Sequence, residues 1–161
     1  VERATGAARD EAFRRLVRML AVHETAEQEI VHPFVRRTVS GGAGVVQDRL
    51  KEEESAKRIL TRLDTMDTEH PEFLNELNSL RTEVMRHARA EERYEFNHLY
   101  QAASAEQLAR LAKGVQAAEA VAPTRPHPEL QSAGANITLG PLAALIDRTR
   151  EVIRGATGER H

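Results

Sequence analysis

Apolar residues recur every three or four positions along most of this chain, which is the period of an amphipathic α-helix. Where glycine, proline or small polar residues interrupt the period, we expect loops. The pattern predicts four helices, over about residues 10–37, 45–66, 68–101 and 104–120. A glycine-rich break is expected over residues 40–44, and Ser104 with Gln107 gives a capping-box pattern at the start of the fourth helix. No segment alternates apolar and polar residues as a half-buried strand does. The sequence therefore predicts an all-α fold, an up-down helical bundle.

The chain changes character after the fourth predicted helix. Three prolines between residues 123 and 128 exclude a regular helix there, because proline lacks the N–H and clashes with the preceding turn. A last amphipathic helix is expected to begin at Gly140. We therefore divide the chain into a bundle over 1–120 and a tail over 121–161. The tail is predicted to be an extended, proline-rich arm with a terminal helix that packs on the bundle or on a partner subunit.

The composition narrows the class of protein. Hydrophobic residues are 40% of the chain and charged residues 30%, which is an ordinary balance for a soluble domain. A net charge of -2 gives no basic field for nucleic acid. No apolar run approaches the roughly 20 residues that span a bilayer. The chain has no cysteine, which excludes thiolate metal sites and fits a reducing compartment, so we expect a cytoplasmic protein.

Two histidine–glutamate pairs share one spacing, His23 with Glu27 and His87 with Glu91. Residues four apart lie on one face of a helix, so each pair can aim an imidazole and a carboxylate at one point. Both pairs also continue an apolar stripe that should face the core. The apolar residues that flank the pairs at spacings of three and four are Phe13, Leu16, Leu20, Ile30, Phe34, Leu77, Leu80 and Val84.

A glutamate on a core-facing stripe needs a partner, because a buried charge is costly unless it is paired or bound to a cation. Two such helices facing each other would bring two histidines and two glutamates to one centre. That is a ligand set for a carboxylate-bridged di-metal site in a helical bundle. The alternative is a metal-free network of hydrogen bonds among the same side chains.

These motifs resemble the hemerythrin-like family, also called the HHE cation-binding domain. Its pattern is a lone histidine, a His-x3-Glu pair, a further histidine and a second His-x3-Glu pair, one element per bundle helix. The two pairs match, as do Pro33, ten residues after His23, and the double acid Glu91-Glu92. The resemblance covers about residues 16–99. It implies a four-helix bundle that holds two irons, bridged by oxo and carboxylate groups.

The resemblance also implies a function and leaves alternatives. The irons would bind or react with dioxygen, peroxide or nitric oxide, in sensing, storage or detoxification, and whether the protein is an enzyme stays open. The alternative is a metal-free helical interaction or dimerisation module of the same fold, in which case a homodimer is expected. If no further helix precedes Val1, the helix from Ser104, the one from Pro141 or a second chain must fill the bundle.

Two histidines of the family pattern have no counterpart in this sequence. The lone one is expected on a helix before Val1. The internal histidine belongs near residues 51–57, where glutamates are the only side chains that could replace it as metal ligands. Glu53 is the favoured substitute because apolar residues follow it at helical spacing, and Glu54 is the weaker one. A carboxylate there makes the site harder and more anionic, which favours oxygen or peroxide activation over reversible dioxygen carriage.

Two further residues adjoin the pairs. Tyr94 lies on the buried stripe near Glu91 and is a weaker site candidate, since its hydroxyl could hydrogen-bond a bridging carboxylate. His32, beside Pro33 near the end of the first helix, is expected at the surface.

Overall fold

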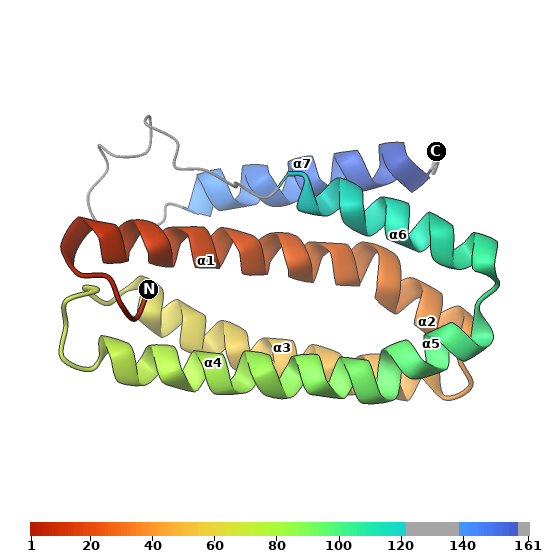
Figure 1. Cartoon of the computed structure of the whole chain (residues 1–161), viewed down its shortest axis with the longest axis horizontal. Helices are drawn as coiled ribbons and strands as arrows, with labels where there is room; N and C mark the ends of the chain where they lie inside the picture. Colours follow the sequence, from red (N-terminus) through yellow and green to blue (C-terminus); the bar gives the residue numbers. More distant parts are fainter. Residues whose placement is uncertain (122–138, 158–161) are drawn as a thin grey trace.

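The computed structural model describes residues 1–121 and 139–157, and nearly all of them are helical (Figure 1). The prediction of an all-α helical bundle is confirmed. In chain order the elements are α1 (Gly6–Ala26), η1 (Glu27–Val31), α2 (His32–Thr38), α3 (Gly42–Asp64), α4 (Phe73–Ala90), η2 (Glu91–Phe96), α5 (Asn97–Ala102), α6 (Ala105–Glu119) and α7 (Leu139–Thr157). The elements η1 and η2 are π-helical segments inside two long helices, α1 to α2 and α4 to α5.

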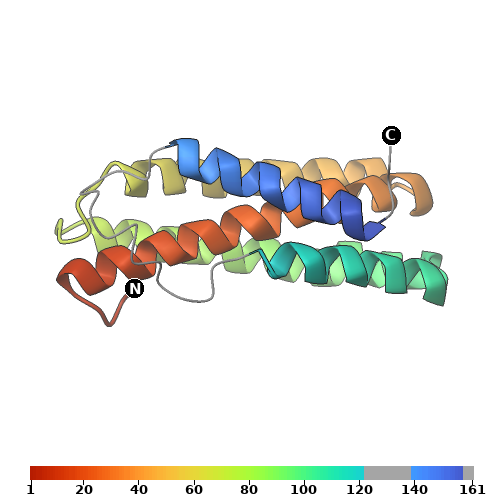
Figure 2. The same ribbon diagram turned by 90° about the horizontal axis from the view of Figure 1, so that it is seen from above.

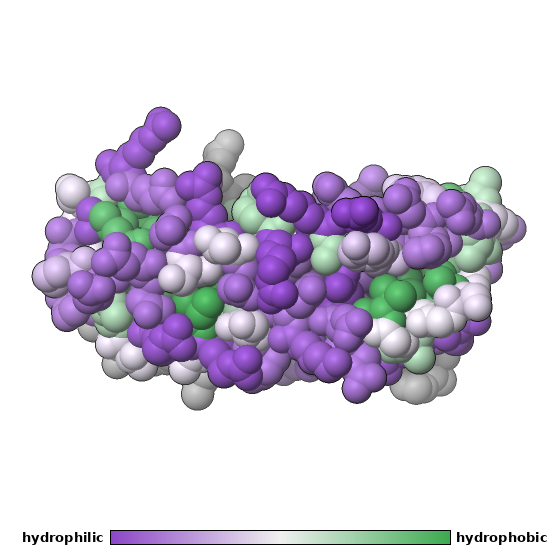
Figure 3. All heavy atoms as spheres, turned by 90° about the horizontal axis from the view of Figure 1, so that it is seen from below, coloured by the Kyte–Doolittle hydropathy of each residue, from purple (hydrophilic) through white to green (hydrophobic). Residues whose placement is uncertain are grey.

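Helix α1 lies between two pairs of helices. On one side α3 and α4 run side by side, and on the other α6 and α7 pack on each other and on α1 (Figures 1 and 2). The outer face of the α3 and α4 side is mostly hydrophilic, with only small separate apolar patches (Figure 3). The apolar stripes of these helices therefore face inward, as the periodicity predicts.

The turn between α2 and α3 differs from the glycine-rich loop that the sequence predicts over residues 40–44. Only Gly41 has a left-handed backbone, with φ of 72°, and α3 already begins at Gly42. Gly42 is needed for a different reason. A Cβ there would lie 2.2 Å from the Val35 carbonyl oxygen, so no larger residue fits where α3 meets α2.

Two apolar cores lie along the bundle rather than one. The first surrounds Phe13 on α1, Leu63 on α3 and Phe73 on α4. The second lies at the other end and includes residues of α1, η1 and α2 together with Ala118 and Ile153 of the last two helices. The stretch between the two cores holds polar side chains, which the next subsection describes.

Helices α6 and α7 cover η1. Gly114 lets α6 approach closely, since a Cβ there would lie 2.7 Å from Ile30 Cδ1. Arg150 of α7 pairs with Glu29 at 2.9 Å. Because α6 and α7 pack on this side of α1, neither lines the groove between α1 and α4 at the opposite side. The predicted extended arm falls in residues 122–138, outside the described residues, and stays a prediction.

None of the helices in the two described ranges combines the length and the apolar character that crossing a membrane requires.

The start of α6 offers a test of the helix-capping prediction. Ser104 and Gln107 form the capping box that the sequence indicates, with Gln107 N donating to Ser104 Oγ at 3.2 Å and Ser104 N donating to Gln107 Oε1 at 2.8 Å. We expect Ser104→Ala to lower the free energy of unfolding by about 1 kcal/mol. That corresponds to a fall of about 2–4 °C in the thermal midpoint, measurable by circular dichroism. Ser79→Ala on an exposed helical face is the control, and an equal fall there would contradict the capping role.

Candidate metal centre

The polar layer between the two apolar cores collects histidines and glutamates from three long helices. Along α3, for example, Val46 belongs to one core and Leu63 to the other, with the buried Glu53 between them. The same order of apolar, polar and apolar residues recurs along the other two helices. The acidic and imidazole groups that meet in this layer are His23, Glu27, His32, Glu53, His87, Glu91 and Glu95.

Both His-x3-Glu pairs end at the first residue of a π-helical segment. Glu27 begins η1 and Glu91 begins η2. In η1 the His32 N–H donates to the Glu27 carbonyl, five residues back, which widens the turn by one residue. Pro33 follows directly and gives a physical cause, since it has no N–H to continue the α-helical ladder. The wider turn places His32 on the same face as Glu27.

The first group of donors surrounds His87. Its Nε2 lies 3.6 Å from Glu27 Oε2 and 3.7 Å from Glu91 Oε2. On the other side of Glu27, His23 Nε2 lies 2.9 Å from Glu27 Oε1. Donor atoms of His23, Glu27 and Glu91 all lie within 4.8 Å of one another, which is close enough for one cation.

The second group of donors surrounds His32. Its Nε2 lies 3.7 Å from Glu53 Oε1 and 3.8 Å from Glu95 Oε1. Donor atoms of Glu27, His32 and Glu53 again lie within 4.8 Å of one another. Glu27 therefore belongs to both groups, and its carboxylate stands between two positions that could each hold a cation.

Many polar atoms of this layer have no hydrogen-bond partner within the described part of the chain. They include both carboxylate oxygens of Glu95, both ring nitrogens of His32 and Oε1 of Glu53. Buried acceptors without partners are costly and rare in folded proteins. Carboxylate oxygens and imidazole nitrogens are ligands for first-row divalent metals, so the donor set fits a metal pair.

Burial and mutual repulsion shift the acidity of these groups in the metal-free protein. Burial raises the pKa of Glu95 to about 7 and that of Glu53 to about 7. Burial, with the neighbouring Glu27, raises the pKa of Glu91 to about 10. Burial also opposes ionisation of Glu27, but the neighbouring imidazoles of His23 and His87 outweigh it and hold the Glu27 pKa well below its usual range. The layer thus holds protons that a cation would displace.

Burial shifts the pKa of His32 downward, in contrast to the raised pKa values of the buried glutamates. Burial lowers the pKa of His32 to about 4, so its imidazole is neutral near pH 7 and its nitrogen lone pair is available. A neutral imidazole is the form that ligates metals.

The structure places most of the predicted site residues together and corrects others. His23, Glu27, Glu53, His87 and Glu91 meet in the layer, and Glu54 is exposed and paired with Arg58. The expectation for Tyr94 is wrong, because it is 49% exposed. The expectation that His32 lies at the surface is also wrong, because it is only 3% exposed.

Both corrections follow from the π-helical segments. In the wide turn of η2, the residue three positions after Glu91 is rotated away from the polar layer, which exposes Tyr94. The residue four positions after Glu91, which is Glu95, is brought to the layer instead. Glu95, fully buried, takes the place that the sequence predicts for Tyr94. Its spacing was a usable signal, since His87, Glu91 and Glu95 follow one another at intervals of four.

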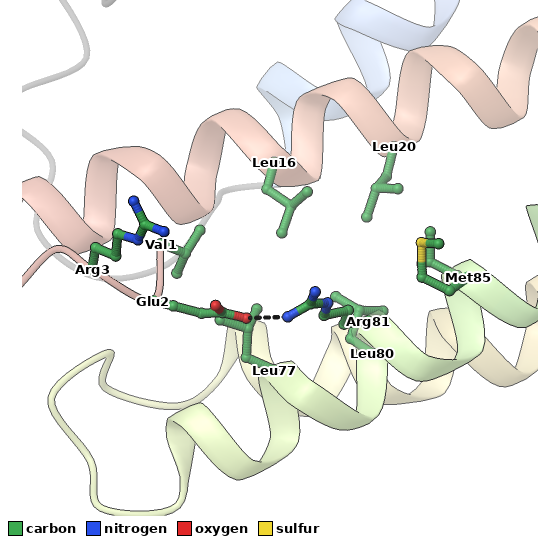
Figure 4. Close-up of a pocket in the computed structure, with 10 residues that line it drawn as sticks. Val1, Glu2, Arg3, Leu16, Leu20, Leu77, Leu80, Arg81 and Met85 are labelled. Carbon is green, nitrogen blue, oxygen red and sulfur yellow. Dashed lines mark hydrogen bonds and ion pairs between the residues drawn. The ribbon is translucent and has the colours of Figure 1, made fainter.

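Two openings approach the layer. An apolar groove of about 410 Å³ runs between α1 and α4, with Leu16 and Leu20 facing Leu77 and Leu80, and the Glu2–Arg81 ion pair at its edge (Figure 4). Leu20 lies three residues before His23, so the groove ends within a turn of that histidine.

The second opening, of about 370 Å³, is lined by Gln28, His32, Arg36, Arg37 and neighbouring residues. It includes one residue of the layer, His32, whereas the groove ends near His23 without including it. The His23 side chain is itself 60% exposed, so this edge of the layer is open to solvent.

Comparison with known proteins agrees with this geometry. The model of the hemerythrin HHE cation-binding domain matches residues 1–99. A DNA nickase from Nostoc sp. is 31% identical over 109 residues, which are 68% of this chain and 30% of that protein. The chain thus matches less than a third of this relative's length. No solved structure gives a significant match. With most of its length covered by the family model, the chain belongs to the hemerythrin HHE cation-binding family.

Proposed function

We propose that this protein holds two iron ions in the polar layer and binds or reacts with dioxygen, peroxide or nitric oxide there. Membership of a cation-binding family establishes the general property, and the donor set supports the particular one. His23, Glu27, His87 and Glu91 would hold one ion. His32, Glu53 and Glu95, together with Glu27, would hold the other.

The observation that carries the proposal is the shared position of Glu27. A carboxylate can bridge two cations, and a bridge keeps the pair close while offsetting part of its charge. A metal-free interaction module would leave the buried oxygens of Glu95 and the ring nitrogens of His32 without hydrogen-bond partners. That arrangement costs free energy that a cation recovers.

The irons would supply Lewis-acid and redox chemistry at a position open to a small molecule. The chain's own residues do the rest. The apolar cores on both sides of the layer keep water away from its buried carboxylates, Glu27, Glu91 and Glu95, which strengthens their electrostatic interactions. The exposed edge at His23 and the opening at His32 would let a diatomic molecule or peroxide approach the donors.

The relative from Nostoc sp. does not change this proposal. The matched segment is 30% of that protein, and the name DNA nickase describes the whole of it. The polar layer is buried except at His23, and its donors suit a cation and a small molecule.

Metal content is the direct test. Protein loaded with ferrous iron without oxygen and then desalted should contain two irons per chain by mass spectrometry. Exposure to air should then produce near-ultraviolet and visible absorption bands of a ferric pair, and nitric oxide should change the spectrum of the reduced form. One iron or none in a folded protein would overturn the di-iron proposal.

We expect iron affinity to rise with pH between about 6 and 8. Below pH 7 the carboxyls of Glu53 and Glu95, whose pKa values are raised to about 7, carry protons that the ion must displace. Above pH 7 the carboxyls of Glu53 and Glu95 are ionised and no longer make the iron affinity depend on pH. Glu91, whose pKa is raised to about 10, still carries a proton that the ion must displace. Chelator competition in buffers of different pH measures the slope.

Glu95→Gln should reduce the slope of iron affinity against pH. The reduction should be up to one proton released per ion bound, because the variant removes one titrating group. Glu54→Gln, on an exposed residue, should leave the slope unchanged. An unchanged slope in the Glu95 variant would count against Glu95 as a ligand.

A further inference from the structure

The two ring nitrogens of His87 face different partners. Nε2 points into the polar layer, 3.6 Å from Glu27 and 3.7 Å from Glu91. Nδ1 points away from it and lies 3.2 Å from Glu52 Oε2. An ionised carboxylate only accepts hydrogen bonds, so Nδ1 must carry the proton of this contact. In the neutral ring, Nε2 is then left with its lone pair directed at the layer.

Glu52 is itself held in place. Arg49 Nε lies 3.0 Å from Glu52 Oε2, and Arg49 Nη2 donates to Glu52 Oε1 at 3.1 Å. Arg49 thus contacts both oxygens, one by a hydrogen bond and the other by an ion pair, which restricts where the carboxylate can lie. Arg49 is buried and Glu52 nearly so, with 14% of its side chain exposed, so water competes little for the contact.

This arrangement also excludes Glu52 from the donor groups. One of its oxygens is shared by Arg49 and His87, and the other faces Arg49, with Arg86 at 3.9 Å. The sequence run Glu52-Glu53-Glu54 therefore divides its three carboxylates by role. Glu53 faces the layer, Glu54 faces solvent, and Glu52 lies behind His87.

We propose that Glu52, clamped by Arg49, is the positioning residue for His87, fixing its tautomer and ring orientation so that Nε2 faces the metal position. The inference rests on the proposed function for the identity of the ion, and not for the contact itself. Metal-ligating histidines are commonly oriented by such a carboxylate, and losing it typically costs roughly 10- to 100-fold in metal affinity. His32 has no comparable support, since its Nδ1 has no partner in the described ranges.

The test compares three variants with the wild type. Glu52→Ala removes the acceptor, Glu52→Gln keeps a carbonyl oxygen that can accept from Nδ1, and Glu54→Ala changes the exposed neighbour as a matched control. Ferrous iron affinity is measured by chelator competition. Histidine ¹⁵N spectra of the metal-free proteins report which nitrogen of His87 carries the proton, with His87→Gln identifying the signal. Circular dichroism and thermal midpoints establish that each variant is folded.

The expected result is an affinity loss of roughly 10- to 100-fold for Glu52→Ala, a smaller loss for Glu52→Gln and none for Glu54→Ala. In spectra recorded at a pH high enough for the His87 ring to be neutral, its proton should stay on Nδ1 in the wild type and in Glu52→Gln, and become distributed over both nitrogens in Glu52→Ala. Wild-type affinity, or a proton still fixed on Nδ1, in folded Glu52→Ala would overturn the proposal. If the wild type binds no iron, the di-iron proposal fails, and the ¹⁵N spectra alone decide the role of Glu52.

Discussion

Glu27→Ala should reduce bound iron to background. Glu27 is the one side chain that belongs to both groups of donors, so its loss removes a ligand from each position and the bridge between them. The fall in affinity should exceed the roughly 100-fold that marks the upper range for an outer partner of a metal ligand. Mass spectrometry of iron-loaded, desalted protein measures it, and the ferric absorption bands should disappear in parallel.

Two further variants serve as controls for the Glu27→Ala prediction. Glu54→Ala removes a carboxylate from the exposed face of α3 and should keep the full iron content. Glu27→Gln keeps the size of the side chain but not its charge, and should also lose most of the iron. A Glu27→Ala protein that is folded and still holds two irons would show that Glu27 does not bridge the ions.

Phe73→Ala should cost about 3–5 kcal/mol of unfolding free energy. Phe73 is fully buried at the start of α4 and packs edge-on against Phe13, with ring centroids 5.2 Å apart. Removing its ring leaves a cavity in the apolar core beside the polar layer and breaks the contact between α1 and α4. For a chain of this length the thermal midpoint should fall by roughly 6–20 °C.

The adjacent residue provides the control for this prediction. Leu74 is 40% exposed on the same turn, and Leu74→Ala should change stability by no more than about 0.5 kcal/mol. Denaturant melts of the metal-free proteins separate the two effects, because bound iron would add its own stabilisation. Equal losses for the two variants would mean that the Phe73 side chain is not part of a packed core.

Much of the fold could be predicted from the sequence because its helices are long and strongly periodic. The ends of the predicted helices differ from the observed ones by at most five residues, as at Phe73 against the predicted Thr68. The two His-x3-Glu pairs are local patterns whose four-residue spacing already fixes a shared face. Glu53 likewise follows from the apolar residues at helical spacing after it.

The rest of the candidate site depends on a π-helical turn and on contacts between helices, which the spacing of apolar residues does not predict. A straight α-helix would turn His32 away from Glu27, and only the wide turn of η1 brings it back. The role of Glu52 depends on Arg49 and on a residue of another helix, His87, and a single-helix pattern does not contain that contact. The sequence also could not decide where the last two helices pack.

The polar layer separates the bundle into two apolar halves, and this division has a consequence for how the molecule opens. Neither core continues through the layer, so in the metal-free protein the helices there are joined by histidine and glutamate side chains rather than by packed apolar ones. Local unfolding begins where buried apolar contacts are fewest. An ion held from three helices would act as a cross-link at that weak point, so metal loading would join two cooperative units into one.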